Sequence, residues 1–153
     1  MAEPGLARWC AAALLATPDG RYLMQLRDPK PTILLPDHWA LFGGSVEPGE
    51  SAADAIRREL REELRFEARE VAAFTELTIE LPFVPPRRDR MSFFDVPIEE
   101  RDVAVMVLGE GAGMRLFRAE EVAALAKVAP WDLAAVLMHG RRSTLFGRAP
   151  ASP

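Results

Sequence analysis

Three glutamates in the first half of the chain have the spacing of a cation site. Glu59, Glu62 and Glu63 lie at positions i, i+3 and i+4, so a helix carries all three on one face. Carboxylates this close repel one another at neutral pH unless a cation neutralises them. A hard divalent cation with oxygen ligands, Mg²⁺ first and Mn²⁺ second, suits such a group. The sequence therefore predicts a metal site on an acidic helix face that is exposed to solvent.

The residues around these glutamates indicate how the helix is positioned. A Pro-Gly turn precedes Ser51, which together with Asp54 can cap the N-terminus of the helix. Gly43 and Gly44 allow the backbone to approach a ligand closely because they carry no Cβ. A stripe of apolar residues at helical spacing lies on a different face and predicts packing on a core: Ala53, Ile56, Leu60 and Leu64.

The whole segment from Gly44 to Phe66, GSVEPGESAADAIRRELREELRF, resembles the Nudix box. It consists of a glycine, five residues, Glu50, seven residues, and then RELREE beginning at Arg58. Six residue types at six fixed offsets make a chance match a poor explanation at ordinary residue frequencies. One position departs from the family pattern, since Arg65 stands where the box normally has a glycine that ends the helix in the left-handed conformation.

The resemblance implies an activity and a cofactor. Nudix enzymes hydrolyse a nucleoside diphosphate linked to another moiety, which includes nucleotide sugars, ADP-ribose and nucleoside triphosphates, and they require Mg²⁺. By this resemblance Glu59, Glu62 and Glu63 are the metal ligands, with the carbonyl group of Gly44 as a further ligand. Mn²⁺ is the alternative metal.

The resemblance also implies roles for the neighbouring residues. Arg58 would orient a ligand carboxylate, while Glu50 and Gly43 would support the loop and helix of the box. The general base stays open between two candidates. One is Glu59 in the box, and the other is Glu110, a glycine-flanked glutamate at the end of an expected strand.

Candidate substrate-binding residues outside the box are arginines. Arg27 ends an expected strand, and Arg87 and Arg88 belong to a Pro- and Arg-rich segment that could grip a phosphate. A run of arginines beside prolines is also typical of a solvated loop, so that alternative stays open. The sequence identifies neither the base nor the leaving group of a substrate.

The resemblance leaves two alternatives to hydrolysis, since other functions occur on the Nudix fold. A catalytically silent nucleotide-binding or regulatory module usually has substitutions among the box glutamates, and this chain has none. An isoprenoid diphosphate isomerase needs a catalytic cysteine, but Cys10, the only cysteine, lies in an apolar strand-like run.

The composition of the chain limits the number of domains, the kind of partner and the location that we expect. With 153 residues, 49% hydrophobic and 27% charged, the chain fits one globular domain over residues 1–153, with residues 149–153 as a frayed tail. A formal charge of −4 argues against an extended nucleic-acid surface. The apolar run over residues 9–16 is too short to span a membrane and lacks the features of a secretion signal. We therefore expect a cytoplasmic enzyme with a small-molecule substrate, and a homodimer is compatible with the sequence.

Local patterns predict an α+β fold in which helices cover a mixed sheet, as in the α/β/α sandwich that the Nudix resemblance implies. The pattern predicts a hairpin of two strands around the turn at 17–20, a short strand before the box, and the box helix. The Pro- and Arg-rich segment from Pro82 to Arg90 reads as a loop. The expected strands are Cys10–Ala16, Arg21–Arg27, Trp39–Phe42, the later part of Val71–Leu81, Met91–Ile98 and Val103–Leu108, followed by helices over Ala119–Val128 and Pro130–His139.

Overall fold

The strands form one mixed sheet in the computed structural model, which describes residues 6–83 and 85–146. The seven strands of this described chain are β1 Leu6–Ala16, β2 Arg21–Leu26, β3 Trp39–Ala40, β4 Phe42–Ser45, β5 Ala72–Leu81, β6 Arg87–Pro97 and β7 Gly113–Arg118. The central order is β3-β2-β1-β6-β5, with β4 paired to β1 and β7 paired to β2. Only β1 and β6 run parallel, and the other pairs are antiparallel.

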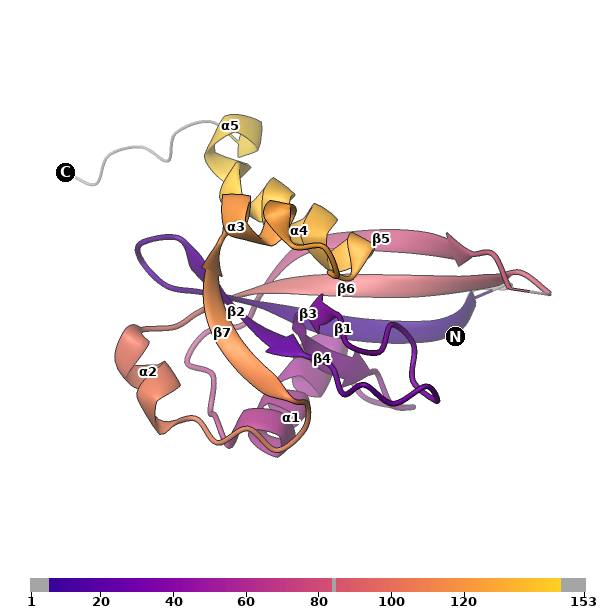
Figure 1. Ribbon diagram of the computed structural model, residues 1–153, viewed down its shortest axis with the longest axis horizontal. Coiled ribbons are helices and arrows are strands. Elements are labelled where there is room, and N and C mark those ends of the chain that lie inside the picture. The colour runs from indigo at the N-terminus through magenta and orange to yellow at the C-terminus, as the bar shows by residue number, and fades with distance from the viewer. Residues whose placement is uncertain (1–5, 84, 147–153) are drawn as a thin grey trace.

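Helices cover both faces of this sheet (Figure 1). One face carries α1 (Ala52–Leu64) and the short α2 (Glu100–Val105). The opposite face carries α3 (Ala119–Ala124) and α4 (Pro130–Gly140), and α5 (Arg142–Phe146) follows α4. The predicted α/β/α sandwich is confirmed. None of the helices in residues 6–83 and 85–146 has the length and apolar character needed to cross a membrane.

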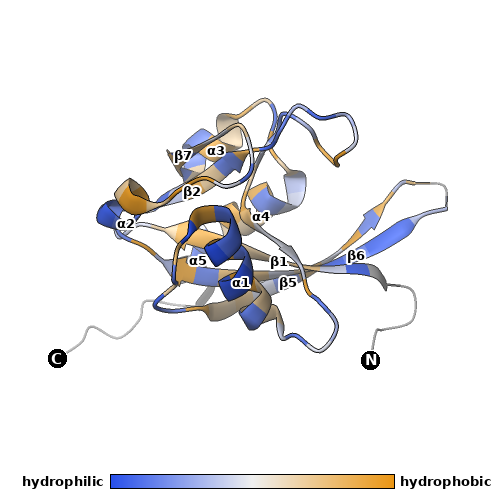
Figure 2. Cartoon of the chain, turned by 90° about the horizontal axis from the view of Figure 1, so that it is seen from below, coloured by the Kyte–Doolittle hydropathy of each residue, from blue (hydrophilic) through white to orange (hydrophobic). Residues whose placement is uncertain are grey.

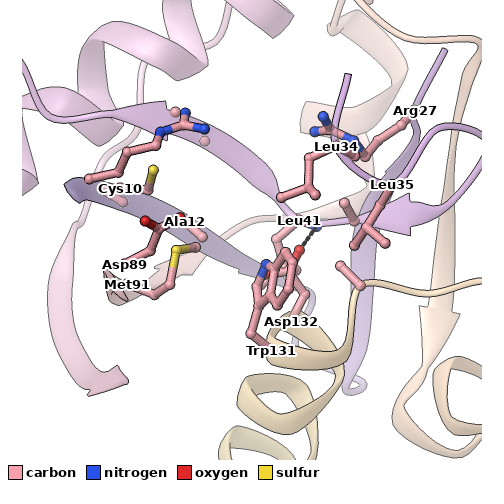
Figure 3. A pocket seen from close by; sticks show the side chains of 16 residues that line it. Cys10, Ala12, Arg27, Leu34, Leu35, Leu41, Asp89, Met91, Trp131 and Asp132 are labelled. Atoms are coloured by element: carbon pink, nitrogen blue, oxygen red, sulfur yellow. Dashed lines mark hydrogen bonds between the residues drawn. The ribbon is translucent and has the colours of Figure 1, made fainter. Parts of the chain in front are cut away.

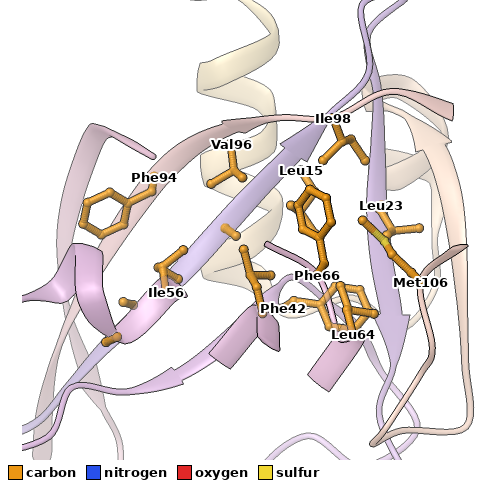
Figure 4. Packing of buried hydrophobic residues seen from close by; sticks show 14 of the residues in the cluster. Leu15, Leu23, Phe42, Ile56, Leu64, Phe66, Phe94, Val96, Ile98 and Met106 are labelled. Carbon is orange, nitrogen blue, oxygen red and sulfur yellow. The ribbon is translucent and has the colours of Figure 1, made fainter. Parts of the chain in front are cut away.

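Strand β1 lies at the centre and is buried on both faces. Because successive side chains of a strand point to opposite faces, Ala11, Ala13 and Leu15 pack towards α1, while Ala12 and Leu14 pack towards α4. Figure 4 shows the first of these clusters. The outer face of α1 is hydrophilic in Figure 2, and its inner face carries the predicted apolar stripe, of which the fully buried members are Ile56, Leu60 and Leu64.

The predicted hairpin forms, but its two strands pair over a short length. β1 meets β2 only at the pair Ala16–Tyr22. The reason is that β4 occupies the preceding part of the same edge of β1, from Cys10 opposite Ser45 to Ala13 opposite Phe42. This pairing delivers the chain directly from the centre of the sheet into the loop before α1.

Two predictions about the middle of the chain were wrong. Residues 87–90 are not part of a loop, because they continue β6 and pair with β5 from Leu81–Arg87 to Thr78–Arg90. In the expected strand Val103–Leu108, the first half belongs to helix α2 and the second half has no regular secondary structure. The start of this helix is fixed by Asp102, whose Oδ2 accepts a hydrogen bond from the backbone N–H of Glu99 at 2.7 Å.

The C-terminal part differs from the prediction in length and number of elements. Strand β7 and helix α5 were not predicted. Helix α3 ends at Ala124 because the following residues pair with the start of β3, where the N–H of Ala129 donates to the carbonyl of Trp39 at 2.9 Å. The expected frayed tail, residues 149–153, lies outside the described residues.

Helix α1 begins and ends with identifiable caps. The Ser51 side chain accepts a hydrogen bond from the N–H of Asp54 at 3.1 Å, as predicted. At the other end Arg65 adopts the left-handed conformation with φ 51° and ψ 37°, and its N–H donates to the carbonyl of Arg61 at 3.0 Å. The left-handed C-cap therefore forms although the usual glycine is missing, at a cost of about 1 kcal/mol for a residue with a Cβ.

Replacing Arg65 by glycine should stabilise the protein. Arg65→Gly removes the left-handed strain, so we expect the free energy of unfolding to rise by about 1 kcal/mol and the melting temperature by roughly 2–4 °C. Thermal melting followed by circular dichroism measures this. Arg61→Gly, the same change within the helix, is the control and should lower the melting temperature. A lower melting temperature for Arg65→Gly would contradict the proposed strain.

Candidate active site

The acidic face of α1 lines an open cleft of about 740 Å³. Glu59, Glu62 and Glu63 all face this cleft, but they differ in exposure. The Glu59 side chain is 16% exposed and that of Glu62 is 60% exposed, whereas Glu63 is buried at 6%. The expectation that all three carboxylates face solvent was wrong for Glu63, because the loop that follows α2 closes over the C-terminal end of α1.

Arg58 connects the loop before α1 to the acidic face of the helix. Its Nε and Nη2 donate to the two oxygens of Glu50 at 2.9 and 3.0 Å, and Nη2 also donates to the carbonyl of Ser45 at 3.0 Å. Its Nη1 donates to Glu59 Oε1 at 2.7 Å and lies 3.4 Å from Glu62 Oε2. The bonds to Glu50 and then Glu59 raise the pKa of Arg58, and Arg58 in turn lowers the pKa of Glu50. The orientation of the loop and of Glu59 therefore depends on one guanidinium.

Glu63 is the buried member of the carboxylate cluster. Its Oε2 accepts a hydrogen bond from the backbone N–H of Gly43 at 3.2 Å, which links α1 to β4. Burial, and secondarily the carboxylates of Glu59 and Glu110, raises the pKa of Glu63 to about 8. A buried carboxylate beside other carboxylates favours either a proton or a cation as its partner.

The two glycines of β4 allow the helix and the sheet to approach each other. A Cβ at Gly43 would overlap the carbonyl oxygen of Ala11 on the neighbouring strand, and a Cβ at Gly44 would overlap the carboxylate of Glu59. The backbone of β4 therefore forms one wall of the cleft at the position that the sequence predicted.

Glu110 reaches the same cleft from a different element than expected. It does not follow a strand but lies in the loop between α2 and β7. Two backbone hydrogen bonds hold this loop: the N–H of Gly109 donates to the carbonyl of Glu63 at 2.7 Å, and that of Ala112 donates to Leu26 at 2.8 Å. The side chain of Glu110 is exposed, so it can move towards a ligand in the cleft.

Basic side chains line the cleft together with the glutamates. Arg27 does so as predicted, with its Nε donating to the carbonyl of Leu34 at 2.9 Å. Arg8 and Lys30 also line the cleft and were not predicted, because each is an isolated cation with no local pattern. Arg87 and Arg88 were predicted as substrate ligands, but they lie in β6 and line neither this cleft nor the cavity described below. Pairing with β5 holds them away from α1.

The residues of the cleft suit a divalent cation. Within the described residues no three carboxylate, histidine or cysteine side chains are already gathered as a complete metal centre. Mg²⁺, however, is commonly held by one or two carboxylates together with substrate phosphates and water. The buried Glu63, whose pKa is raised, and the neighbouring Glu59 provide hard oxygen ligands. Too little positive charge surrounds them to neutralise both carboxylates. This donor set fits Mg²⁺ or Mn²⁺ and does not fit a soft metal.

A smaller cavity of about 150 Å³ adjoins the cleft (Figure 3). Arg8, Arg27 and the two glycines of β4 line both spaces. At the far side lies Asp132 at the start of α4, whose Oδ2 accepts a hydrogen bond from the N–H of Leu41 at 3.0 Å. Burial raises the pKa of Asp132 to about 7. No pattern in the sequence marks Asp132 as functional, since an aspartate in the first turn of a helix is ordinarily explained by the helix dipole.

The buried Asp132 predicts a pH dependence of stability. Its pKa rises from 3.8 in the unfolded chain to about 7 in the folded chain, so the folded state binds more protons between these values. Its contribution to the free energy of unfolding is therefore fully present below about pH 3.8, falls progressively as the pH rises from there, and is lost above about pH 7. Asp132→Asn cannot ionise and still accepts the Leu41 hydrogen bond. Urea unfolding at several pH values should show the variant gaining stability relative to the wild type as the pH rises. A constant difference would show that Asp132 does not titrate in this range.

Comparison with known proteins places the chain in a family. Residues 7–140 match the NUDIX domain. The nucleoside triphosphatase NudI of Escherichia fergusonii is 53% identical over 47 residues, which are 30% of this chain and 32% of that protein. The match thus spans about a third of the length of this curated relative.

Solved structures share the fold over nearly the whole chain. The MutT protein from Methanosarcina mazei Go1 has a TM-score of 0.73 and 19% identity, covering 94% of this chain and 99% of that one. The E. coli ORF135 protein has a TM-score of 0.71 and 26% identity, covering 95% and 94%. Together with the domain match, these similarities confirm the resemblance drawn from the box. The chain belongs to the Nudix hydrolase family.

Proposed function

We propose that this protein is a divalent-metal-dependent pyrophosphohydrolase that acts on nucleoside triphosphates. The family supports hydrolysis of a pyrophosphate linkage, and the similarity to a nucleoside triphosphatase over the 47 matched residues supports a triphosphate substrate. The observation that carries the proposal is the cleft itself. It combines the acidic face of α1 with cations from β1 and from the loop after β2, and a metal-bound polyphosphate needs both kinds of charge.

The residues of the cleft divide into two groups by charge. Glu59, Glu62 and Glu63, with the carbonyl group of Gly44, would hold Mg²⁺, which neutralises charge on phosphate oxygens when it is bound. Arg27, and with it Arg8 and Lys30, would bind phosphate oxygens that extend beyond α1. Arg58 is a positioning residue, because its four hydrogen bonds to Glu50, Ser45 and Glu59 fix the loop and one carboxylate relative to the helix.

Two carboxylates are placed to accept a proton from an attacking water. Glu59 is mostly buried and accepts a hydrogen bond from Arg58. Glu110 is exposed on a loop, so it can approach after a substrate has bound. The two candidates thus differ in exposure and in hydrogen bonding, and kinetics can separate them.

The isomerase alternative is disfavoured by the surroundings of Cys10. The thiol lines the smaller cavity, but burial raises its pKa. A nucleophilic or acid–base cysteine needs a lowered pKa or an adjacent base.

Activity should depend strictly on a divalent cation. Nucleoside triphosphates, nucleotide sugars, ADP-ribose and dinucleoside polyphosphates, each incubated with Mg²⁺ and analysed by chromatography for the nucleotide products, identify the substrate. We expect triphosphates to be hydrolysed, excess chelator to abolish the reaction, and Mg²⁺ or Mn²⁺ to restore it. Arg88→Gln, a change on β6 away from the cleft, is the control and should leave the rate unchanged. Full activity in chelator would refute the proposal.

The general base can be identified from pH–rate profiles. If Glu110 is the base, Glu110→Gln should lower kcat by roughly 10²–10⁴ and remove the acidic limb of the profile, with little change in substrate binding. Glu59→Gln should then lower the rate through weaker metal binding while the acidic limb remains, and excess metal should partly restore it. The reverse pattern would assign the base to Glu59.

A further inference from the structure

The smaller cavity is built as a binding site that continues the cleft. Strands β1, β4 and β6, the loop at 28–37 and the start of α4 all contribute to its walls. Its volume of about 150 Å³ is that of a cavity known to admit a benzene-sized ring. The aromatic side chain of Trp131 and the apolar side chains of Leu34, Leu35, Leu41 and Met91 line it (Figure 3).

Two buried carboxylates of this cavity each have one oxygen without a hydrogen-bond partner among the described residues. Asp132 is 4% exposed and Asp89 is 6% exposed, and each has one oxygen, Oδ1, with no hydrogen-bond partner among the described residues. The second oxygen of each is occupied, by the N–H of Leu41 for Asp132 and by Arg87 Nη2 at 3.0 Å for Asp89. A buried acceptor without a donor costs free energy, so each Oδ1 calls for a donor from a ligand.

The loop over the cavity is also strained. Leu35 and Asp37 have φ angles of 50° and 59°, in the left-handed region that residues with a Cβ rarely adopt. Leu35 lines the cavity directly. Strain of this kind, together with two unpaired acceptors, is typical of a site whose shape serves a ligand.

We propose that this cavity binds the nucleobase of the substrate and selects bases that carry an exocyclic amino group. The inference rests on the proposed function, in which the cleft next to it holds the polyphosphate. A planar ligand suits this cavity if its apolar face can pack on Trp131 and its edge can donate hydrogen bonds to the two unpaired carboxylate oxygens.

The choice of an amino group follows from hydrogen-bond chemistry. Cytosine and adenine carry an NH₂ group, which donates, where uracil and hypoxanthine carry a carbonyl oxygen, which only accepts. A carbonyl facing Asp132 Oδ1 would place two acceptors against each other in a buried site. A site built around a donor rejects the analogue that lacks it.

Matched pairs of nucleoside monophosphates test this directly. Cytidine and uridine monophosphate differ at the amino or carbonyl group, and adenosine and inosine monophosphate form the equivalent purine pair. Dissociation constants are measured by NMR titration in chelator at about pH 8.5, above the pKa of Asp132, where its carboxylate accepts. We expect the amino member of at least one pair to bind roughly tenfold to a hundredfold more tightly. Equal binding within both pairs, or no binding, would overturn the proposal.

Asp132→Asn provides a sharper test, because it should reverse the preference. The amide oxygen can accept the Leu41 hydrogen bond, which directs the NH₂ group into the cavity as a donor. We therefore expect the variant to prefer uridine or inosine monophosphate. Asp102→Asn is the matched control, since Asp102 is also buried and accepts from a backbone N–H but lines neither space. Its ligand preference should equal that of the wild type.

Further outcomes separate the two proposals. If Asp132→Asn weakens both members of a pair by the same factor, Asp132 has only a structural role and the base-selection proposal fails. Asp89→Asn should reduce the amino preference without reversing it, since Asp89 is the second acceptor. If no triphosphate is hydrolysed in Mg²⁺ while the monophosphate preference holds, the proposed hydrolysis fails and the nucleobase site stands.

Discussion

The hydrogen bonds of a single guanidinium hold the cleft beside α1 together. Arg58 joins the loop that contains Ser45 and Glu50 to Glu59 on α1, and its contacts with the two glutamates are partly buried. Charge-assisted and bidentate bonds of this kind are strong and directional, and a lysine could not reproduce the paired contact with Glu50. Without this anchor the carboxylates of α1 would have the right spacing along the helix but no fixed position relative to β4.

The opposite end of the acidic face is fixed by backbone contacts. Glu63 joins α1 to β4 through the N–H of Gly43, and its own carbonyl receives the N–H of Gly109. One residue therefore positions the glycine wall of the cleft and the loop that carries Glu110. This explains why Glu63 is buried, although its spacing in the sequence is the same as that of a solvent-facing glutamate. Its position is set by what packs over the end of the helix, which helical periodicity does not describe.

The sequence predicts those site residues that lie close together in one helix. It does not predict the site residues that come from distant parts of the chain. The three glutamates, the Ser51 cap and the apolar stripe lie within one helix, so their spacing was sufficient. Arg8, Lys30, Asp89 and Asp132 enter the same region from four separate elements, and no short pattern connects them. The β-branched run at 103–108 also misled, because the capping contacts of Asp102 outweigh the strand propensity of three valines in so short a segment.

The local costs of this fold gather around the two adjoining spaces. The left-handed Leu35, the unpaired oxygens of Asp89 and Asp132, and the buried Glu63 each oppose folding by an amount on the order of 1 kcal/mol or more. Departures of this kind along one continuous groove lie where a ligand could relieve them. A cation would relieve the repulsion at Glu63, and donor groups would satisfy the two aspartates, so the proposed metal-bound substrate, with a phosphate chain at one end and an amino-bearing ring at the other, would suit both parts of the groove.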